Sequence, residues 1–347
     1  MNKLTTSNPL VMKKNLFLTA LAGAIVLTGC SKSEILETEL DRKAIGFENF
    51  MHRATRATEI TGSNVTSESF SIQCYYNDGT DFYTNQTLSY AASAWNTTTT
   101  KYWPYDCVTE GSHTATKSLG FFAYNAGSFS KNGYTGSTTK PTLTYTVAAT
   151  AASQKDVLAG YVEGRIWQTD NSTSIVPLTF NHILSEICFT LVGADPAYKY
   201  EISSLTIGGD ADDAAQLYPT GTYTYGQAAG ALTSLTGTPT TYSYTGSPAL
   251  TLNANASATA ISSDVLMLIP QAATSSVIKV TYKVTDPTTN IVLFEGTKAT
   301  GALAETWQNG KKYTYAITLP TGAHAIQYSV SVNNWETGSV TSNLALN

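Results

Sequence analysis

The sequence predicts an all-β protein made of two β-sandwich domains in tandem. Charged residues make up only 13% of the chain, and Thr, Ser, Tyr and Gly are abundant. Several stretches alternate apolar and polar residues with a period of two, and none sustains a helical period. Thr, Tyr and Val suit pleated, half-buried surfaces, whereas Gly, Asn, Asp and Ser supply turns. The composition is typical of an extracellular β-protein.

Length and charge limit the class of function. The 347 residues are enough for a leader and two domains of ordinary size. The formal net charge is −5, so the chain lacks the concentrated basic surface that nucleic-acid binding needs. We therefore expect no nucleic-acid partner.

Strand-like stretches follow one another through both halves. In the second half the alternation is clearest, which predicts half-buried antiparallel strands. The continuous apolar run Val265–Ile269 predicts a central strand covered on both faces. A polar break before Ile175 places the domain boundary there, giving domains of residues 58–175 and 176–347. The clearest predicted strands are Phe70–Tyr76, Leu119–Tyr124, Leu143–Val147, Val157–Val162, Ile278–Val284, Tyr313–Leu319 and Tyr328–Val332.

The beginning of the chain resembles an export signal. The apolar run Leu16–Leu27 follows two lysines and is too short to span a membrane. It ends in Leu27-Thr28-Gly29-Cys30, which looks like a bacterial lipobox, with residues 1–29 as the signal peptide and Cys30 as the acylated, palmitate-bearing residue. The alternative is an ordinary signal peptide with a chance cysteine. Ser31–Lys43 is polar and predicts a flexible tether.

The remaining cysteines show no metal-ligand spacing. Cys74 and Cys107 could form a disulfide if their strands are neighbours, and Cys188 is expected to be a small buried residue. Disulfides are therefore not expected to be the main source of stability.

No catalytic constellation is recognisable, so we predict that the protein is not an enzyme, with no cofactor and no metal site. The four histidines are scattered, and His182 is expected to be structural. The acidic run Asp210–Asp213 could hold a hard cation, but a solvated loop is the simpler interpretation.

Aromatic residues gather in a loop-like region of the first half. Trp95 and Trp103, with Tyr102 and Tyr105, are the candidates for stacking on a glycan. The alternative is that they pack in a core or at a contact between subunits.

Six stretches, in this order, carry a resemblance to a known family: Leu27–Cys30, Ala44–Phe47 leading to Arg53–Ala57, Asp156–Ala159, Leu178–Ile187, Leu266–Gln271 and Trp307–Tyr315. Together they resemble the fimbrillin family, the lipoprotein-precursor subunits of type V pili. The resemblance implies two transthyretin-like antiparallel β-sandwich domains. It also implies assembly in which an arginine-specific protease removes the lipidated first strand and a strand of another subunit fills the groove.

The residues that match this assembly lie near both ends of the chain. Residues 30–57 are expected to be the lipidated tether and removable strand, and residues 336–347 the donor tail, whose even spacing of apolar residues suits an extended peptide. Without cleavage the arginines would be solvated charges, and the tail could instead be a frayed terminus. The matching residues are Ile45, Phe47 and Phe50 for the removable strand, Arg53 and Arg56 for the cleavage site, and Val340, Leu344 and Leu346 for the tail.

The sequence thus predicts a structural subunit of a surface fimbria that supports cell adhesion at the outer membrane. Its expected partners are other pilin subunits, the protease, the membrane through its lipid, and host or microbial glycans or proteins. The alternative is a tip adhesin, an anchor or a monomeric glycan-binding lipoprotein that uses Trp95 and Trp103. Glycan binding by an uncleaved monomer would favour that alternative.

Overall fold

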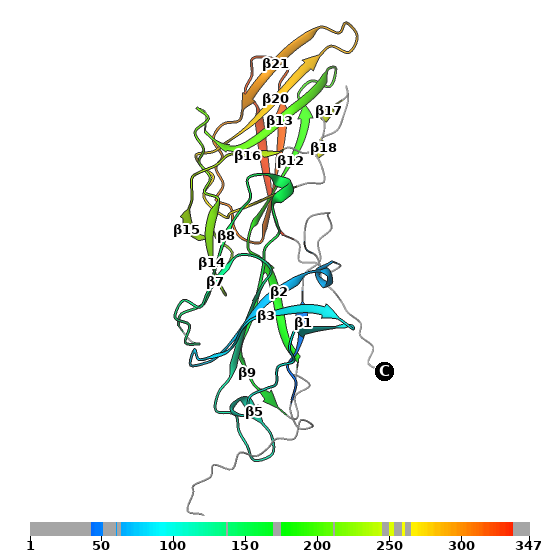
Figure 1. Cartoon of the computed structure of the whole chain (residues 1–347). Helices are drawn as coiled ribbons and strands as arrows, with labels where there is room; N and C mark the ends of the chain where they lie inside the picture. The colour runs from blue at the N-terminus through cyan, green and yellow to red at the C-terminus, as the bar shows by residue number, and fades with distance from the viewer. Residues whose placement is uncertain are drawn as a thin grey trace, which may run out of the picture. The chain divides into compact units, whose positions relative to one another are not determined.

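The computed structural model describes residues 43–50, 60, 64–136, 138–168, 175–210, 212–244, 250–252, 259–260 and 265–335. These residues belong to one compact unit. They form strands joined by turns and by short 3₁₀ helices, which are η2 (Val65–Ser67), η3 (Tyr105–Cys107) and η4 (Ala151–Ser153). The predicted all-β class is confirmed (Figure 1).

Seven of the described strands close into a barrel in the order β1, β11, β9, β6, β2, β3 and β4. The ring closes because β1 pairs with β11 on one side and with β4 on the other. One strand therefore completes what would otherwise be an open sheet. The barrel strands are β1 (Gly46–Phe50), β2 (Ser69–Tyr76), β3 (Asp81–Ala91), β4 (Ala94–Thr97), β6 (Leu119–Tyr124), β9 (Leu158–Arg165) and β11 (Ile175–His182).

The barrel core follows from the period-two pattern of its strands. In β11 the side chains of Val176, Leu178 and Phe180 are buried in the same apolar cluster, and the residues between them are more exposed. Phe180 lies against Gly160 of β9, where an added Cβ would stand 2.9 Å from the ring. This glycine lets the two strands pack closely around the aromatic ring.

A separate four-stranded sheet covers the outside of the barrel. It consists, in order, of β15 (Thr233–Thr236), β14 (Thr220–Thr224), β8 (Thr142–Thr146) and β7 (Ser128–Ser130). Phe122 of β6 points outward, and its ring centroid lies 5.2 Å from that of Tyr225, which follows β14. Every residue of β6 is consequently buried, on one face by the barrel core and on the other by this packing. A small parallel sheet pairs β5 (Val108–Thr109) with β10 (Trp167–Gln168).

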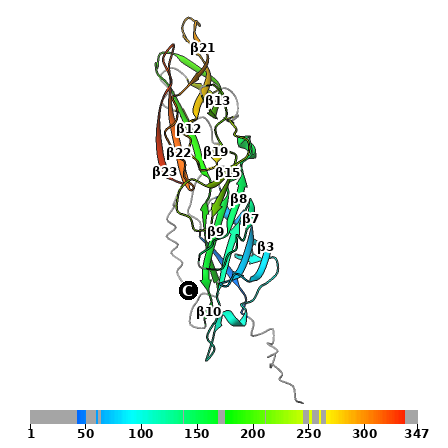
Figure 2. The ribbon, with the colours of Figure 1, turned by 90° about the vertical axis from the view of Figure 1, so that its left-hand side faces the viewer.

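The second half forms two sheets that face each other across a shared apolar core. In the first sheet β12 runs parallel to β22, which pairs with β23, and Figure 2 shows these three strands side by side. The first sheet contains β12 (Ser185–Gly193), β18 (Thr259–Ala260), β19 (Leu266–Leu268), β22 (Lys311–Leu319) and β23 (Gln327–Asn334). The second contains β13 (Lys199–Gly209), β16 (Tyr242–Tyr244), β17 (Leu250–Leu252), β20 (Val277–Thr285) and β21 (Val292–Ala299).

One sequence expectation is wrong in detail. Val265–Ile269 is buried as predicted, but its strand β19 is not central, because among the described strands it pairs with β12 alone. The amide of Met267 instead donates to the side-chain oxygen of Gln154, 2.7 Å away. A side chain from the first half thus satisfies the backbone group that a neighbouring strand would otherwise pair.

The two predicted domains share structure across their expected boundary at Ile175. The strand that starts at this residue, β11, belongs to the barrel, and the second set of sheets begins at Ser185. Strand β8 of the first half pairs along its whole length with β14 of the second. The apolar core accordingly continues from the outer face of the barrel into the second half.

Candidate functional site

The candidate site is the groove of the barrel that β1 occupies. Gly46 to Phe50 run parallel to β11 and pair with Ile175 to Thr179, and Phe47 also pairs with Trp95 of β4. Just before the strand, the amide of Ile45 donates to the carbonyl of Lys101 over 2.8 Å. The backbone of this segment is therefore held on both edges.

Side chains of β1 complete the barrel core. Ile45 and Phe47 are each 6% exposed, and the ring of Phe47 meets that of Phe121 edge to face, with centroids 5.7 Å apart. Glu48, the residue after Phe47 in the strand, is exposed. Burying a Phe or Ile side chain contributes about 1.5–3 kcal/mol, so the segment is fixed by packing as well as by hydrogen bonds. Phe50 lies in the strand, and its side chain is outside the described residues.

Ile60 is the next described residue after Phe50, beyond the predicted cleavage arginines Arg53 and Arg56, which lie outside the described residues. Ile60 is buried in the barrel core, and its amide donates to Oδ2 of Asp156 over 2.9 Å. The other carboxylate oxygen of Asp156 lies 2.9 Å from Nδ1 of His182, at the end of β11. One buried carboxylate thus ties the chain after the arginines to the strand that pairs with β1.

His182 also contacts the last described residue, Trp335. The two rings are stacked, with centroids 4.2 Å apart and planes 8° apart. The Trp335 amide donates to the carbonyl of Gly310 over 2.9 Å, which fixes the point where the tail begins. The predicted tail residues Val340, Leu344 and Leu346 lie outside the described residues, as does the predicted lipidation site Cys30.

A cavity of about 400 Å³ lies at this junction. It is lined by the end of β11, by the turn after β14, by the start of β22 and by the end of β23. Phe180, Asn181 and His182 line it from β11, and Asn334 and Trp335 line it from the other end of the chain. An open space therefore connects the end of β11 with the start of the tail.

Sequence reasoning assigned His182 a structural role and gave none to Asp156 or Ile60. No pattern could have joined them, because the three residues lie far apart in the sequence and meet only when the barrel closes. His182 and Asp156 have the arrangement of a general base and its orienting carboxylate. Within the described residues, however, no hydroxyl or thiol is hydrogen-bonded to the remaining His182 nitrogen. The contacts described for the pair are those with Ile60 and Trp335.

Trp95 and Trp103 are both in the barrel core, at 5% and 6% exposure. The Trp95 ring meets Phe70 edge to face at a centroid distance of 5.6 Å, and the Trp103 ring meets Phe121 at 6.1 Å. Neither ring offers a broad free face while β1 is in place, so a glycan could stack on them only if the barrel opened. Of their loop neighbours, Tyr105 is well exposed.

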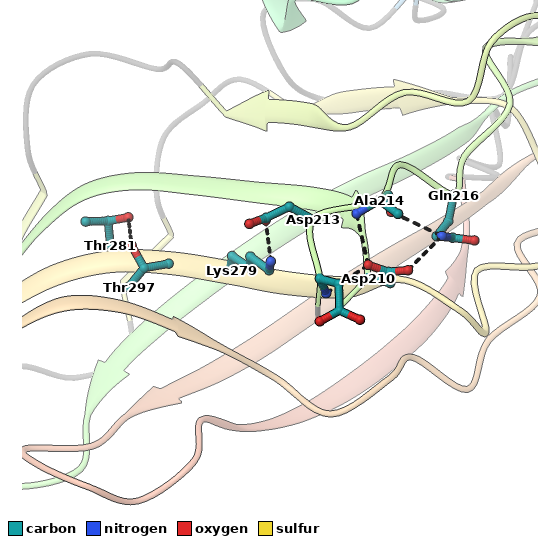
Figure 3. A network of polar contacts seen from close by, with 8 residues as sticks. Asp210, Asp213, Ala214, Gln216, Lys279, Thr281 and Thr297 are labelled. Atoms are coloured by element: carbon teal, nitrogen blue, oxygen red, sulfur yellow. Dashed lines mark hydrogen bonds and ion pairs between the residues drawn. The ribbon is translucent and has the colours of Figure 1, made fainter.

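The acidic run at Asp210 is a hydrogen-bonded turn (Figure 3). Asp210 Oδ1 accepts the amides of Asp212 and Ala214, each 2.9 Å away, and its Oδ2 accepts the side-chain amide of Gln216. Asp213 forms an ion pair with Lys279 of β20. These contacts engage both carboxylate oxygens of Asp210 and one of Asp213. Among the described residues, no group of three or more His, Cys, Asp or Glu side chains is placed to hold a metal ion.

Two of the described cysteines, Cys74 and Cys107, form no disulfide. Cys74 and Cys107 are both buried free thiols, and Cys188 is partly exposed. Burial raises the pKa of Cys74 well above its usual value, and burial together with the nearby Asp106 carboxylate raises the pKa of Cys107 to about 12. Because the thiolate is the reactive form, both thiols are inert in the folded state.

In the part of the chain that the structure describes, no helix is long and apolar enough to cross a membrane.

Comparisons with known proteins identify the family. A fimbrial protein from Bacteroides vulgatus is similar in structure, with a TM-score of 0.64 and 18% identity over 84% of this chain and 99% of that chain. A protein from Bacteroides uniformis matches with a TM-score of 0.51 and 16% identity over 84% of this chain and 98% of that chain. No protein in the curated set matches. Residues 55–335 match the fimbrillin-like family, and the chain belongs to that family.

Proposed function

We propose that this protein is a structural subunit of a cell-surface fimbria, assembled by proteolytic removal of β1 and by donor-strand exchange. Membership of the fimbrillin-like family supports a role in a pilus or in adhesion. The position of β1 is the observation that supports its removal and its replacement by a donor strand. It is a short strand near the beginning of the chain, paired on both sides, and the barrel closes only through it.

Removing β1 would open a groove with a defined chemistry. The edges of β11 and β4 would lose their backbone partners, and the places of Ile45 and Phe47 in the core would be empty. Unpaired edge strands are templates for another strand, and alternate side chains of that strand can fill the apolar positions. A donor strand from another subunit would restore both the hydrogen bonds and the packing.

Cleavage after Arg53 or Arg56 would separate β1 from the rest of the barrel. The next described residue, Ile60, stays attached through Asp156, so the body would keep its new N-terminal segment in place. An arginine-specific protease is the partner this step requires. The residues removed would include the acylated Cys30, which would hold the precursor at the outer membrane until cleavage.

The donor in this proposal is the tail of residues 336–347 from another subunit. Val340, Leu344 and Leu346 share one face of an extended strand, and the tail from Gly338 onward contains neither charge nor proline. This pattern suits a strand that lies in a half-apolar groove. The resulting filament would be a surface fimbria whose other subunits are its main partners.

The test is to digest the purified, unlipidated precursor with an arginine-specific protease and to follow it by mass spectrometry and denaturing electrophoresis. We expect a new N-terminus at Ala54 or Ala57 and ladders that resist SDS and grow with protein concentration. In the double variant Arg53→Ala, Arg56→Ala, β1 should stay joined to the body and the protein should remain monomeric.

The matched control is Arg42→Ala, because cleavage at Arg42 leaves β1 joined to the body. This variant should behave as the wild type. Ladders formed by the double variant, in which β1 is still joined to the body, would contradict the proposal. So would a cleaved wild-type protein that stays monomeric at every concentration.

A further inference from the structure

We propose that, after cleavage, the tail of a subunit can fold back and fill its own groove, so that a cleaved monomer caps itself. This inference rests on the proposed function, because the groove exists only once β1 has left. The second possible occupant of the groove is the segment of residues 336–347 of the same chain. Self-capping would compete with exchange between subunits.

The first support is where the tail begins. Trp335 is stacked on His182, and His182 is the last residue of β11. The backbone of Trp335 is also held by Gly310. The tail therefore leaves the body beside one end of the strand whose edge β1 covers.

The second support is the cavity between Trp335 and the end of that edge. β1 pairs with β11 only as far as Thr179, and the next three residues, Phe180 to His182, line the cavity of about 400 Å³. Asn334 and Trp335 line the same cavity. A chain that leaves Trp335 can turn through this space and reach the edge of β11 without displacing a described strand.

The third support is length and pattern. The sequence continues for twelve residues after Trp335. At about 3.3 Å per residue an extended tail reaches roughly 40 Å, whereas the eight residues of β11 span roughly 26 Å. Val340, Leu344 and Leu346 would face the core positions that Ile45 and Phe47 vacate.

The self-capping strand has the opposite direction to β1. It starts at the His182 end of β11 and runs toward Ile175, which makes it antiparallel to β11, whereas β1 is parallel to it. Antiparallel pairing is slightly more stable per residue. An attached strand also has an effective concentration on the order of millimolar, far above that of separate subunits in dilute solution. Self-capping should therefore dominate when cleaved subunits are scarce.

The experiment measures whether the groove of a cleaved monomer is free. Wild type and the variant Leu344→Asp, Leu346→Asp are cleaved as full chains and diluted to nanomolar concentration. A fluorescent peptide of residues 336–347 is then added, and its binding is followed by anisotropy. We expect the variant to bind the peptide at least tenfold more tightly than the wild type, because charges on the apolar face prevent its own tail from entering the groove.

A matched control places the same charges on the other face of the tail, as Thr341→Asp, Ala345→Asp. This chain should cap itself and should bind the peptide as weakly as the wild type does. If cleaved wild type and the Leu344→Asp, Leu346→Asp variant bind the peptide equally well, self-capping is wrong and exchange between subunits stands. If neither binds it, the groove does not accept this tail, and both proposals fail.

Discussion

The carboxylate of Asp156 lies 2.9 Å from Nδ1 of His182 and has no solvent exposure. Its second oxygen accepts the amide of Ile60. When ionised, this carboxylate can only accept hydrogen bonds, so the Ile60 amide and Nδ1 of His182 would both donate to it. This contact holds together the segment after the predicted cleavage site, the end of β11 and, through the ring of His182, the start of the tail.

Replacing Asp156 should therefore destabilise the protein strongly. Asp156→Ala leaves two buried donors without an acceptor, each costing about 1–3 kcal/mol, and should lower the free energy of unfolding by about 2–5 kcal/mol in urea. Asp156→Asn retains an acceptor oxygen and should cost less. Asp212→Ala, on the exposed acidic turn, is the control and should change stability by less than about 0.5 kcal/mol. Equal losses for Asp156→Ala and Asp212→Ala would show that the buried contact contributes nothing.

Substitutions on the two faces of β1 should differ in their effect on the free energy of unfolding of the uncleaved precursor. Phe47→Ala removes a buried ring from the barrel core and should cost about 3–5 kcal/mol. Glu48→Ala, next to it on the exposed face, should change the free energy of unfolding by less than about 0.5 kcal/mol. Urea unfolding of both variants provides the measurement. A neutral Phe47→Ala would mean that β1 is not part of the barrel core in solution.

Stability should fall at alkaline pH because of buried tyrosines. Burial, with the Asp81 carboxylate nearby, raises the pKa of Tyr75 from 10.0 to about 12, and burial raises that of Tyr223 to about 12. Between the ordinary pKa of 10.0 and the raised pKa of about 12, the folded chain binds more protons than the unfolded chain. The free energy of unfolding therefore falls as pH rises through this range. Below about pH 10 both states keep the proton and these groups have no effect. Urea unfolding from pH 8 to 12, followed together with tyrosine absorbance, should show a loss of the free energy of unfolding only above about pH 10. A steady loss beginning at pH 8 would contradict this account.

The cysteines should react with a thiol reagent in a fixed order. Cys188 is partly exposed and should be modified first in the folded protein, whereas Cys74 and Cys107 should react only on unfolding. Peptide mapping after labelling in buffer and in urea distinguishes the sites. A disulfide between Cys74 and Cys107 in protein recovered from cells would contradict the unpaired state described above.

The sequence predicted those elements whose pattern reflects their own burial. β6 was expected at Leu119–Tyr124 and has those bounds, because both of its faces are covered and every residue is apolar or small. β13 was not expected, because a register shift between Ile202 and Ser204 breaks its alternation. β3 was missed because most of its side chains are exposed, so its pairing leaves little apolar signal.

The candidate site could be predicted only in part. The apolar segment around Phe47 is visible in the sequence, since its alternation lies within a few residues. Its parallel pairing with β11 and its contact with β4 depend on the closure of the barrel. The contact of Asp156 with Ile60 and His182 likewise joins distant segments, and an acidic residue before a strand carries no sign of its partners.

The parallel pairing of β1 with β11 also sets an order of folding. β1 is the first barrel strand in the chain, but its partner β11 is the last of the seven. Two strands that are close in the sequence lose less conformational entropy when they pair than two distant strands do. Contacts between segments as far apart as β1 and β11 therefore form late. The hairpin of β2 and β3 and the pairing of β2 with β6 can form before β11 has emerged. The barrel thus closes only when the last of its seven strands in the chain pairs with the first.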